Sequence, residues 1–224
     1  MSLAPVWGRK VFWKMKKLFG KISLRRFLVM AAGIVLLSLG IALFKLSLMG
    51  NDPSSAMVMA VGDAVGLGFA PMLFIMNCLW FVSEFFFGRR LIGVGTFVNW
   101  FGVGTIASAF VRLISESFTL PTEFFPRLLV MLCGVLVLSL ACSMYQTADL
   151  GIAPYDALSL VLSEKLKKVP YFWCRIFTDA VCTLIAFLFG GIVGIGTLVC
   201  ALGLGPFISF FDRHISRRLC GVDK

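Results

Sequence analysis

Histidine and charged side chains are scarce in this chain of 224 residues. There is one histidine, His214, and charged residues make up 14% of the sequence. The seven cysteines form no C-x-x-C pair and, apart from Cys220, lie inside apolar segments, so we interpret them as small apolar residues. No histidine pair, metal-spaced cluster or serine elbow is present. We therefore expect no enzyme activity, no cofactor and no metal site.

Hydrophobicity is what the sequence has in place of charge. Hydrophobic residues make up 59% of the chain, and the mean hydropathy is +0.96, whereas an ordinary soluble domain is about 45–50% apolar. Apolar runs such as residues 27–44 and 128–144 suit helices crossing a hydrocarbon core of ~30 Å, which takes about 20 residues. The alternation typical of a β-barrel is absent. These features predict an all-α membrane protein.

An internal repeat divides the chain into two units with an offset of 101 residues. G-N-D-P-S-S-A at residues 50–56 matches G-I-A-P-Y-D-A at 151–157. At the same offset, G-V-G-T at 93–96 matches G-I-G-T at 194–197, and G-V-G at 102–104 matches G-L-G at 203–205. A unit repeated in this way is a supersecondary block that should fold twice. We place repeat one at residues 27–114 and repeat two at 128–211.

Each repeat predicts three transmembrane helices and one shorter helix. Asp52 is a good N-cap and Pro53 suits a first helical position, so a helix should begin there. About 13 residues would extend only ~20 Å, too short to cross the membrane, so this element is re-entrant or lies at the interface. The expected spans are residues 27–49, 71–87, 91–114, 128–147, 171–189 and 192–211, with half-helices at 53–66 and 154–166.

The segments outside the repeats are basic or polar. Residues 1–26 alternate lysines with apolar residues at helical spacing, which predicts an interfacial helix on anionic lipid headgroups. A cleaved signal peptide is the competing interpretation, but no apolar h-region with a small-residue cleavage site precedes the first span. Residues 115–127 are predicted to form an extracytoplasmic linker, and residues 212–224 a basic cytoplasmic tail.

Three spans per repeat is an odd number, so the second repeat should enter the membrane from the opposite side. With both termini cytoplasmic, the cytoplasmic side holds all of the 21 cationic residues except Lys45, Arg112, Arg127 and Arg175, as the positive-inside rule requires. If the half-helices crossed the membrane fully, Arg89 and Arg90 would face outward, which fits the positive-inside rule less well. The net charge of +10 thus follows from topology and implies no nucleic acid partner. The result is a 3+3 inverted repeat with one broken helix in each unit.

The paired G-x-x-P-x-D-A and G-x-G-T…G-x-G-P-F segments resemble the YczE/YyaS/YitT group of bacterial membrane proteins, in particular its YczE-like branch. The resemblance covers residues 27–211. Tyr155 fills the aromatic position between proline and aspartate, whereas repeat one has Ser54 and Ser55 there and its carboxylate at Asp52. The resemblance implies a multi-pass protein of the bacterial cytoplasmic membrane; such proteins are usually described as transporters or simply as integral membrane proteins, and the family supplies no agreed substrate.

The candidate site lies where the two half-helices begin. Helix N-termini carry unpaired N–H groups and a partial positive charge, so two facing N-termini would suit an anionic or zwitterionic solute. Asp156 is the strongest single candidate for binding the solute, because it is not at an N-cap and capping cannot explain it. For Asp52, capping its own helix remains an alternative to binding the solute. The predicted site residues are Asp52, Pro53, Ser54, Ser55, Asn99, Pro154, Tyr155, Asp156, Arg175 and Asp179.

The roles of several further polar residues are also considered. Arg175 and Asp179 are spaced i,i+4, so they can form an ion pair that is either structural or part of a proton or solute pathway. Asn99 could contact the solute or make an interhelical hydrogen bond. Glu84 is expected to face Arg89 and Arg90 at the cytoplasmic edge.

The function that fits these features is a small secondary transporter or facilitator of a small polar solute, which could be an anion. The alternative is a non-transporting binding subunit or assembly factor that acts with a partner complex, and a homodimer is also open.

Overall fold

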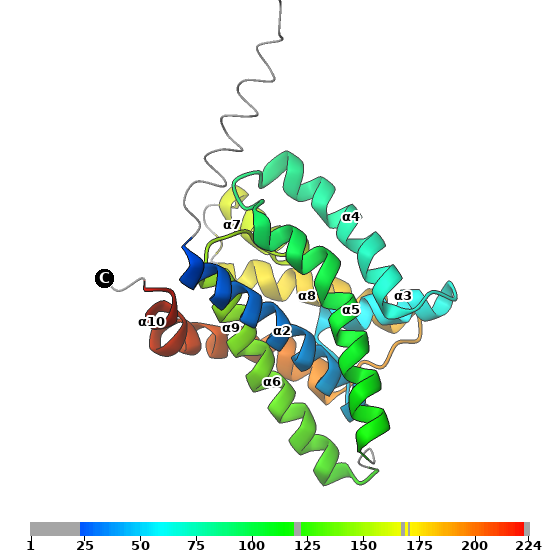
Figure 1. The fold of residues 1–224 in the computed structure, drawn as a ribbon. Helices are drawn as coiled ribbons and strands as arrows, with labels where there is room; N and C mark the ends of the chain where they lie inside the picture. Colours follow the sequence, from blue (N-terminus) through cyan, green and yellow to red (C-terminus); the bar gives the residue numbers. More distant parts are fainter. Residues whose placement is uncertain (1–22, 119–121, 167–168, 170, 222–224) are drawn as a thin grey trace, which may run out of the picture.

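The computed structural model describes residues 23–118, 122–166, 169 and 171–221, and these residues form helices without a strand among them (Figure 1). Residues 1–22, most of the predicted interfacial helix, lie outside the described part. In chain order the helices are α2 (Leu24–Ser47), α3 (Pro53–Ala64), α4 (Phe69–Phe87), α5 (Val94–Ser117), α6 (Phe124–Thr147), α7 (Pro154–Lys165), α8 (Tyr171–Leu188), α9 (Ile195–Phe211), the π-helix η1 (Asp212–Ser216) and α10 (Arg217–Cys220).

Five stretches of the described chain are long and apolar enough to cross a membrane. They are α2, α4, α5, α6 and the continuous segment Ile195–Cys220. Helix α8 has 18 residues, carries both Arg175 and Asp179, and is not among the five. The all-helical, membrane-spanning class is therefore confirmed, while six spans in an inverted arrangement stay a prediction.

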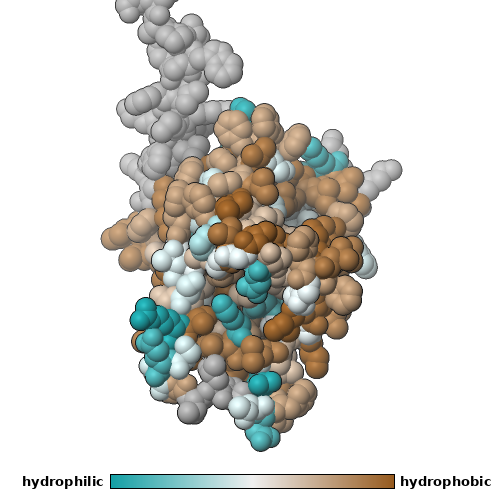
Figure 2. All heavy atoms as spheres, turned by 90° about the vertical axis from the view of Figure 1, so that its right-hand side faces the viewer, coloured by the Kyte–Doolittle hydropathy of each residue, from teal (hydrophilic) through white to brown (hydrophobic). Residues whose placement is uncertain are grey.

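Hydrophobic side chains cover much of the outer surface. Large exposed ones project from several helices, among them Leu79 and Phe86 of α4, Phe101 of α5 and Phe187 of α8, each more than 60% exposed. Figure 2 shows one face on which hydrophobic residues dominate and hydrophilic ones form small groups. A soluble monomer rarely exposes apolar area on this scale, whereas lipid tails would cover it.

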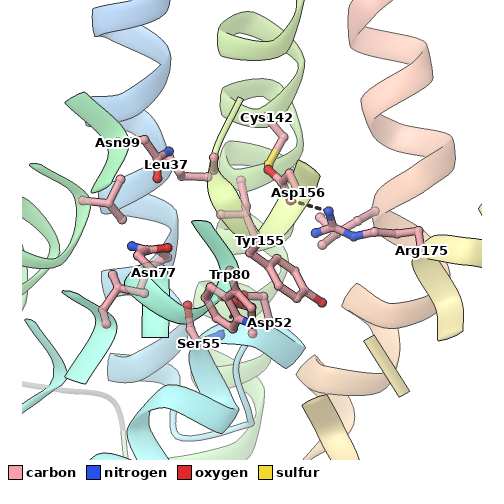
Figure 3. A pocket seen from close by; sticks show the side chains of 17 residues that line it. Leu37, Asp52, Ser55, Asn77, Trp80, Asn99, Cys142, Tyr155, Asp156 and Arg175 are labelled. Atoms are coloured by element: carbon pink, nitrogen blue, oxygen red, sulfur yellow. Dashed lines mark hydrogen bonds and ion pairs between the residues drawn. The ribbon is translucent and has the colours of Figure 1, made fainter. Parts of the chain in front are cut away.

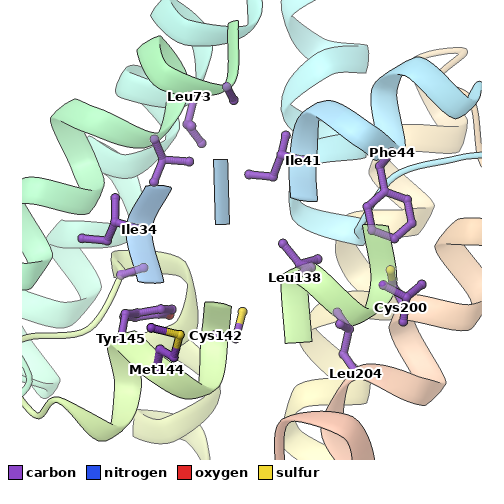
Figure 4. Close-up of a cluster of buried hydrophobic side chains, with 14 of the residues drawn as sticks. Ile34, Ile41, Phe44, Leu73, Leu138, Cys142, Met144, Tyr145, Cys200 and Leu204 are labelled. Atoms are coloured by element: carbon purple, nitrogen blue, oxygen red, sulfur yellow. The ribbon is translucent and has the colours of Figure 1, made fainter. Parts of the chain in front are cut away.

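The core lies along the crossing of α2 and α6, which are side by side and run in opposite directions (Figure 1). Ile34 and Phe44 of α2 and Leu138 and Tyr145 of α6 are almost wholly buried there (Figure 4). Leu204 of α9 joins the same cluster. This pair of helices forms the scaffold on which the shorter helices are arranged.

Elements that match by the 101-residue offset make matching contacts with the other half of the chain. Helix α3 packs on α8, and its counterpart α7 packs on α4. The backbone N–H of Gly95 donates to the carbonyl of Leu150 at 2.7 Å, and the equivalent N–H of Gly196 donates to Met49 at 2.9 Å. Each loop that precedes a short helix is thus bonded to the start of a long helix in the other repeat.

The two loops need glycine for this contact. Gly50 and Gly151 have φ angles of +106° and +120°, a region that residues with a side chain rarely adopt. A side chain on Gly151 would also meet the backbone of Gly93 at 2.7 Å. The paired glycine motifs of the sequence therefore correspond to places where two backbones touch.

Several predicted boundaries differ from the observed ones. Helix α6 begins at Phe124 and α5 continues to Ser117, so the connection between them is shorter than the predicted linker at 115–127. The chain after Phe211 stays helical to Cys220, so the first part of the predicted basic tail continues from α9. It is anchored by side chains, because Thr147 donates to Asp212 at 2.8 Å and the Ser143 and Ser216 hydroxyls lie 2.6 Å apart.

Candidate functional site

The two short helices begin inside the protein and end at its surface. In α3, the residues from Pro53 to Val58 are buried, whereas Asp63 and Ala64 are exposed. Helix α7 shows the same gradient, from buried Pro154 to exposed Glu164. A proline at the first position costs no hydrogen bond, because that N–H would have no partner within the helix. The unpaired N–H groups of both helices therefore lie in the interior.

An aspartate already compensates each of these buried N-termini. Asp52 caps α3, and its Oδ2 accepts a hydrogen bond from the Ser55 N–H at 3.0 Å, as predicted. In α7 the N-cap residue Ala153 has no capping side chain, and the acidic residue of the first turn is Asp156. A carboxylate near a helix N-terminus is stabilised by the helix dipole.

A buried charge network links α7 to α8. The Arg175 guanidinium forms an ion pair with Asp156 and a second one, at 3.3 Å, with Asp179. Tyr155 donates a hydrogen bond from its hydroxyl to Asp179. The same guanidinium lies over the Tyr155 ring, 4.9 Å from its centre. Burial of these charges is tolerated because each one has a charged partner and hydrogen bonds.

A cavity of ≈ 70 Å³ lies between the starts of α3 and α7 (Figure 3). One water molecule needs roughly 10–15 Å³ of such space, so the cavity has room for a few waters or one small solute. Seven of the ten predicted site residues line it: Asp52, Ser54, Ser55, Asn99, Tyr155, Asp156 and Arg175. The structure brings together residues that are more than 120 positions apart in the sequence, from α3 to α8.

The other three predicted residues do not line this cavity. Pro53 and Pro154 are buried at the helix starts, where they terminate the preceding loops. Asp179 lies on the far side of Arg175 and lines a second pocket of ≈ 260 Å³ between α8 and α9. Arg175 lines both the cavity and the second pocket. Its ion pairs with Asp156 and Asp179 therefore connect a carboxylate of the cavity to a carboxylate of the pocket.

Two polar atoms at the cavity lack a hydrogen-bond partner within the described part of the chain. They are Oδ1 of Asp52 and Nδ2 of Asn99. The Asn99 side chain is only 5% exposed and lies at the cavity edge (Figure 3). Buried polar atoms are normally paired, so an acceptor and a donor are left for a group that the protein itself does not provide.

Sequence reasoning missed two cavity residues, Asn77 and Trp80 of α4. Asn77 is 3% exposed, and the Trp80 ring lies 5.0 Å from the Tyr155 ring, centre to centre. The sequence did contain a signal for both residues. Asn77 is an amide within an apolar run, which is unusual in a transmembrane helix, and Trp80, three residues later, lies on the same helix face.

The prediction that Glu84 faces Arg89 and Arg90 is wrong. Glu84 is 1% exposed, and neither carboxylate oxygen has a partner among the described residues. Arg90 instead pairs with Glu164 of α7, while Arg89 donates to the Phe85 carbonyl at 2.7 Å. Helix α4 ends at Phe87 and the chain turns at Gly88, so the two arginines leave the helix face on which Glu84 is buried.

Among the described residues, no group of three or more His, Cys, Asp or Glu side chains is arranged to hold a metal ion. The cysteines there are all free thiols, and Cys142 lines the central cavity as an apolar wall.

The exposed apolar surface, the membrane-length helices and the buried half-helices together define a multi-pass membrane protein. The chain belongs to a family of unknown function, DUF6198, whose model matches residues 24–213. The YczE-like resemblance is thereby confirmed. No solved structure matches the chain.

Three curated relatives match the chain at low identity. The chain is 26% identical over 197 residues to the uncharacterized protein YyaS of Bacillus subtilis, covering 84% of this chain and 95% of the relative. It is 24% identical over 182 residues to the uncharacterized membrane protein YczE of the same organism, covering 80% and 81%. An uncharacterized protein of Haemophilus influenzae is 25% identical over 189 residues, 84% of each chain.

Proposed function

We propose that this protein is a small secondary transporter or facilitator of a small polar solute, which binds in the central cavity between α3 and α7. The observation that carries the proposal is that both short helices point buried N-termini at one cavity with unsatisfied polar atoms. Broken helices that meet at a buried polar site are a recurring design of transporters, in which unwound backbone and helix ends bind the solute.

The proposal includes an inverted repeat with six spans, α8 being the sixth. Three observations support it: the gap-free offset of 101 residues, the opposite directions of α2 and α6 (Figure 1), and the matching loop contacts of Leu150 and Met49. In such proteins one repeat rocks against the other around a fixed site, which opens the site to each side in turn.

We further propose that both termini are on the cytoplasmic side of a bacterial inner membrane. Arg90 pairs with Glu164, and the Lys165 ammonium lies 3.2 Å from the centre of the Phe87 ring, so two basic segments meet at one end of the protein. Arg25 donates to the carbonyls of Arg218 and Leu219, which joins the beginning of α2 to α10. Clustering of basic residues at one end favours that end as cytoplasmic.

The test is ligand binding by the purified protein, followed by solute uptake into proteoliposomes. A thermal-shift screen of small polar solutes should yield a ligand that stabilises the wild type, by about 2.7 kcal/mol at 100 times its Kd. Asp156→Asn should abolish the shift, because it removes the carboxylate that positions Arg175 beside the cavity.

Asp149→Asn is the matched control, since Asp149 is exposed and its φ of +53° suits asparagine. It should bind and transport as the wild type does. Equal binding by Asp156→Asn would contradict the site, and a folded protein that binds and moves no solute would contradict transport. In that case a co-purifying protein would identify the chain as a binding subunit or assembly factor.

A further inference from the structure

Carboxylates outnumber cations at the central cavity and around the arginine that lines it. Three aspartates, Asp52, Asp156 and Asp179, surround it or its arginine, and Arg175 is the one cationic residue lining it within the described chain. With the carboxylates ionised, one positive charge faces three negative ones. Arg175 already binds two of them, Asp156 and Asp179, so Asp52 is the carboxylate that lacks a cationic partner.

The helix N-termini do not reverse this balance. Each N-terminus carries roughly half a positive charge, and each already has an aspartate: Asp52 accepts from Ser55 N–H at 3.0 Å, and Asp156 lies in the first turn of α7. An anionic solute would have to displace these carboxylates. A site built for an anion from two free helix ends, which the sequence favoured, is therefore disfavoured by the side chains that occupy those ends.

The unpartnered atoms specify what a ligand must bring. Oδ1 of Asp52 has no donor, and Nδ2 of Asn99 has no acceptor. Asn99 is 5% exposed, so bulk water does not satisfy its amide. A solute that carries an N–H or O–H donor at one end and a hydrogen-bond acceptor at the other would satisfy both.

Part of the cavity wall is aromatic. Trp80 and Tyr155 both line it, with ring centres 5.0 Å apart (Figure 3). One Tyr155 face already has a cation, the Arg175 guanidinium. Aromatic faces attract cations, and tryptophan does so most strongly. The indole of Trp80 is thus the second element, after Asp52, that favours a positive ligand.

We propose that the cavity binds a small organic cation, a protonated amine that also carries a hydrogen-bond acceptor. The ammonium lies at Asp52 beside the Trp80 ring, and the acceptor lies at Asn99. A volume of ≈ 70 Å³ limits the ligand to a few non-hydrogen atoms. This inference rests on the proposed function and names the substrate class of the same site.

The experiment compares three probes of nearly equal size that differ in charge: ethanolamine, ethylene glycol and glycolate. Each is titrated at constant ionic strength into the purified protein in detergent, and binding is read from the thermal shift. Ethanolamine should stabilise the wild type, while ethylene glycol and glycolate should leave its Tm unchanged. Asp52→Asn should weaken ethanolamine binding by roughly 10- to 100-fold, the loss expected for one charge-assisted hydrogen bond.

The variants are chosen so that a loss of binding can be separated from a loss of structure. Asp52→Asn keeps an oxygen that can cap α3, so its helix content and elution volume should match those of the wild type. Trp80→Leu should also weaken ethanolamine binding, and Asp149→Asn should not.

Failure of this inference and failure of the proposed function would give different results. Stabilisation by glycolate alone, undiminished in Asp52→Asn, would overturn the cation assignment and leave the transporter proposal standing. Ethanolamine binding equally well to Asp52→Asn would overturn the assignment of Asp52 as the ammonium site. If none of the probes and no solute in the wider screen binds or is taken up, both the inference and the proposed function fail.

Discussion

Replacing Gly194 by alanine should destabilise the protein, because this residue touches the opposite repeat through its backbone. A Cβ at Gly194 would lie 2.2 Å from the carbonyl oxygen of Met49 and 2.7 Å from its carbon. These are backbone atoms and cannot rotate away, so the loop at Met49 must move. The same carbonyl accepts the 2.9 Å hydrogen bond from Gly196, and the movement would break it.

The magnitude follows from these two effects. Loss of one backbone hydrogen bond costs about 0.5–1.5 kcal/mol, and forcing an extra methyl group into a filled space costs about 1–3 kcal/mol. Together they predict about 2–4 kcal/mol for Gly194→Ala, or roughly 5–15 °C in Tm for a chain of this size. The control is Gly203→Ala in α9, the helix that Gly194 precedes, where the nearest atoms to the new Cβ lie 3.9 Å away. Its Tm should stay unchanged or rise, because alanine favours helix by up to ~1 kcal/mol.

The assay is thermal unfolding of both variants in the same detergent, followed by tryptophan fluorescence and by the fraction that stays monodisperse. The other repeat provides an independent copy of the experiment. Gly93→Ala would put a Cβ 2.2 Å from the Leu150 carbonyl oxygen, whereas Gly102→Ala meets its nearest atom at 3.6 Å. Equal stability of Gly194→Ala and Gly203→Ala would refute the reasoning, and so would a loss confined to one repeat.

Substitutions at three further residues test the buried polar groups by their Tm. Arg175→Gln should cost about 3–5 kcal/mol, because it leaves two buried carboxylates without their cation; full stability would contradict a structural role, and Arg175→Lys should recover only part because lysine lacks the planar fork. Tyr155→Phe should cost about 1.5–3 kcal/mol through its lost hydrogen bond to Asp179, and an unchanged Tm would show that this bond contributes nothing. Glu84→Leu should raise stability by about 1–3 kcal/mol, since both carboxylate oxygens lack a partner among the described residues; a fall in Tm would reveal an interaction that Glu84 makes in the membrane.

The features that the sequence predicted correctly are the ones set by local chemistry. The helix beginning at Pro53 and the Asp52 cap follow from residue preferences at helix starts, which act over one turn. The pair of Arg175 and Asp179 follows from i,i+4 spacing alone. The second short helix at Pro154 follows from the repeat. None of these inferences needed knowledge of which helices pack together.

The features that sequence reasoning missed depend on packing between distant helices. The ion pair of Arg175 with Asp156 and the approach of Trp80 to Tyr155 join helices whose relative rotation no spacing rule specifies. Glu84 was assigned to nearby arginines because they are close in the chain. Helix α4 ends at Phe87, so the turn after it, and not helical periodicity, sets the direction of Arg89 and Arg90.

Each short helix packs against a long helix of the other repeat, and this arrangement bears on the order in which the protein can fold. When residues up to Ser117 have been synthesised, α3 is present but its packing partner α8 is not. The buried start of α3, with Asp52 and its prolyl turn, cannot yet have its final surroundings. Helix α3 can pack against α4 of its own repeat at that stage, but it reaches its final packing only once α8 has been synthesised. The two repeats therefore cannot reach their final structures one after the other, because each packs against a helix of the other.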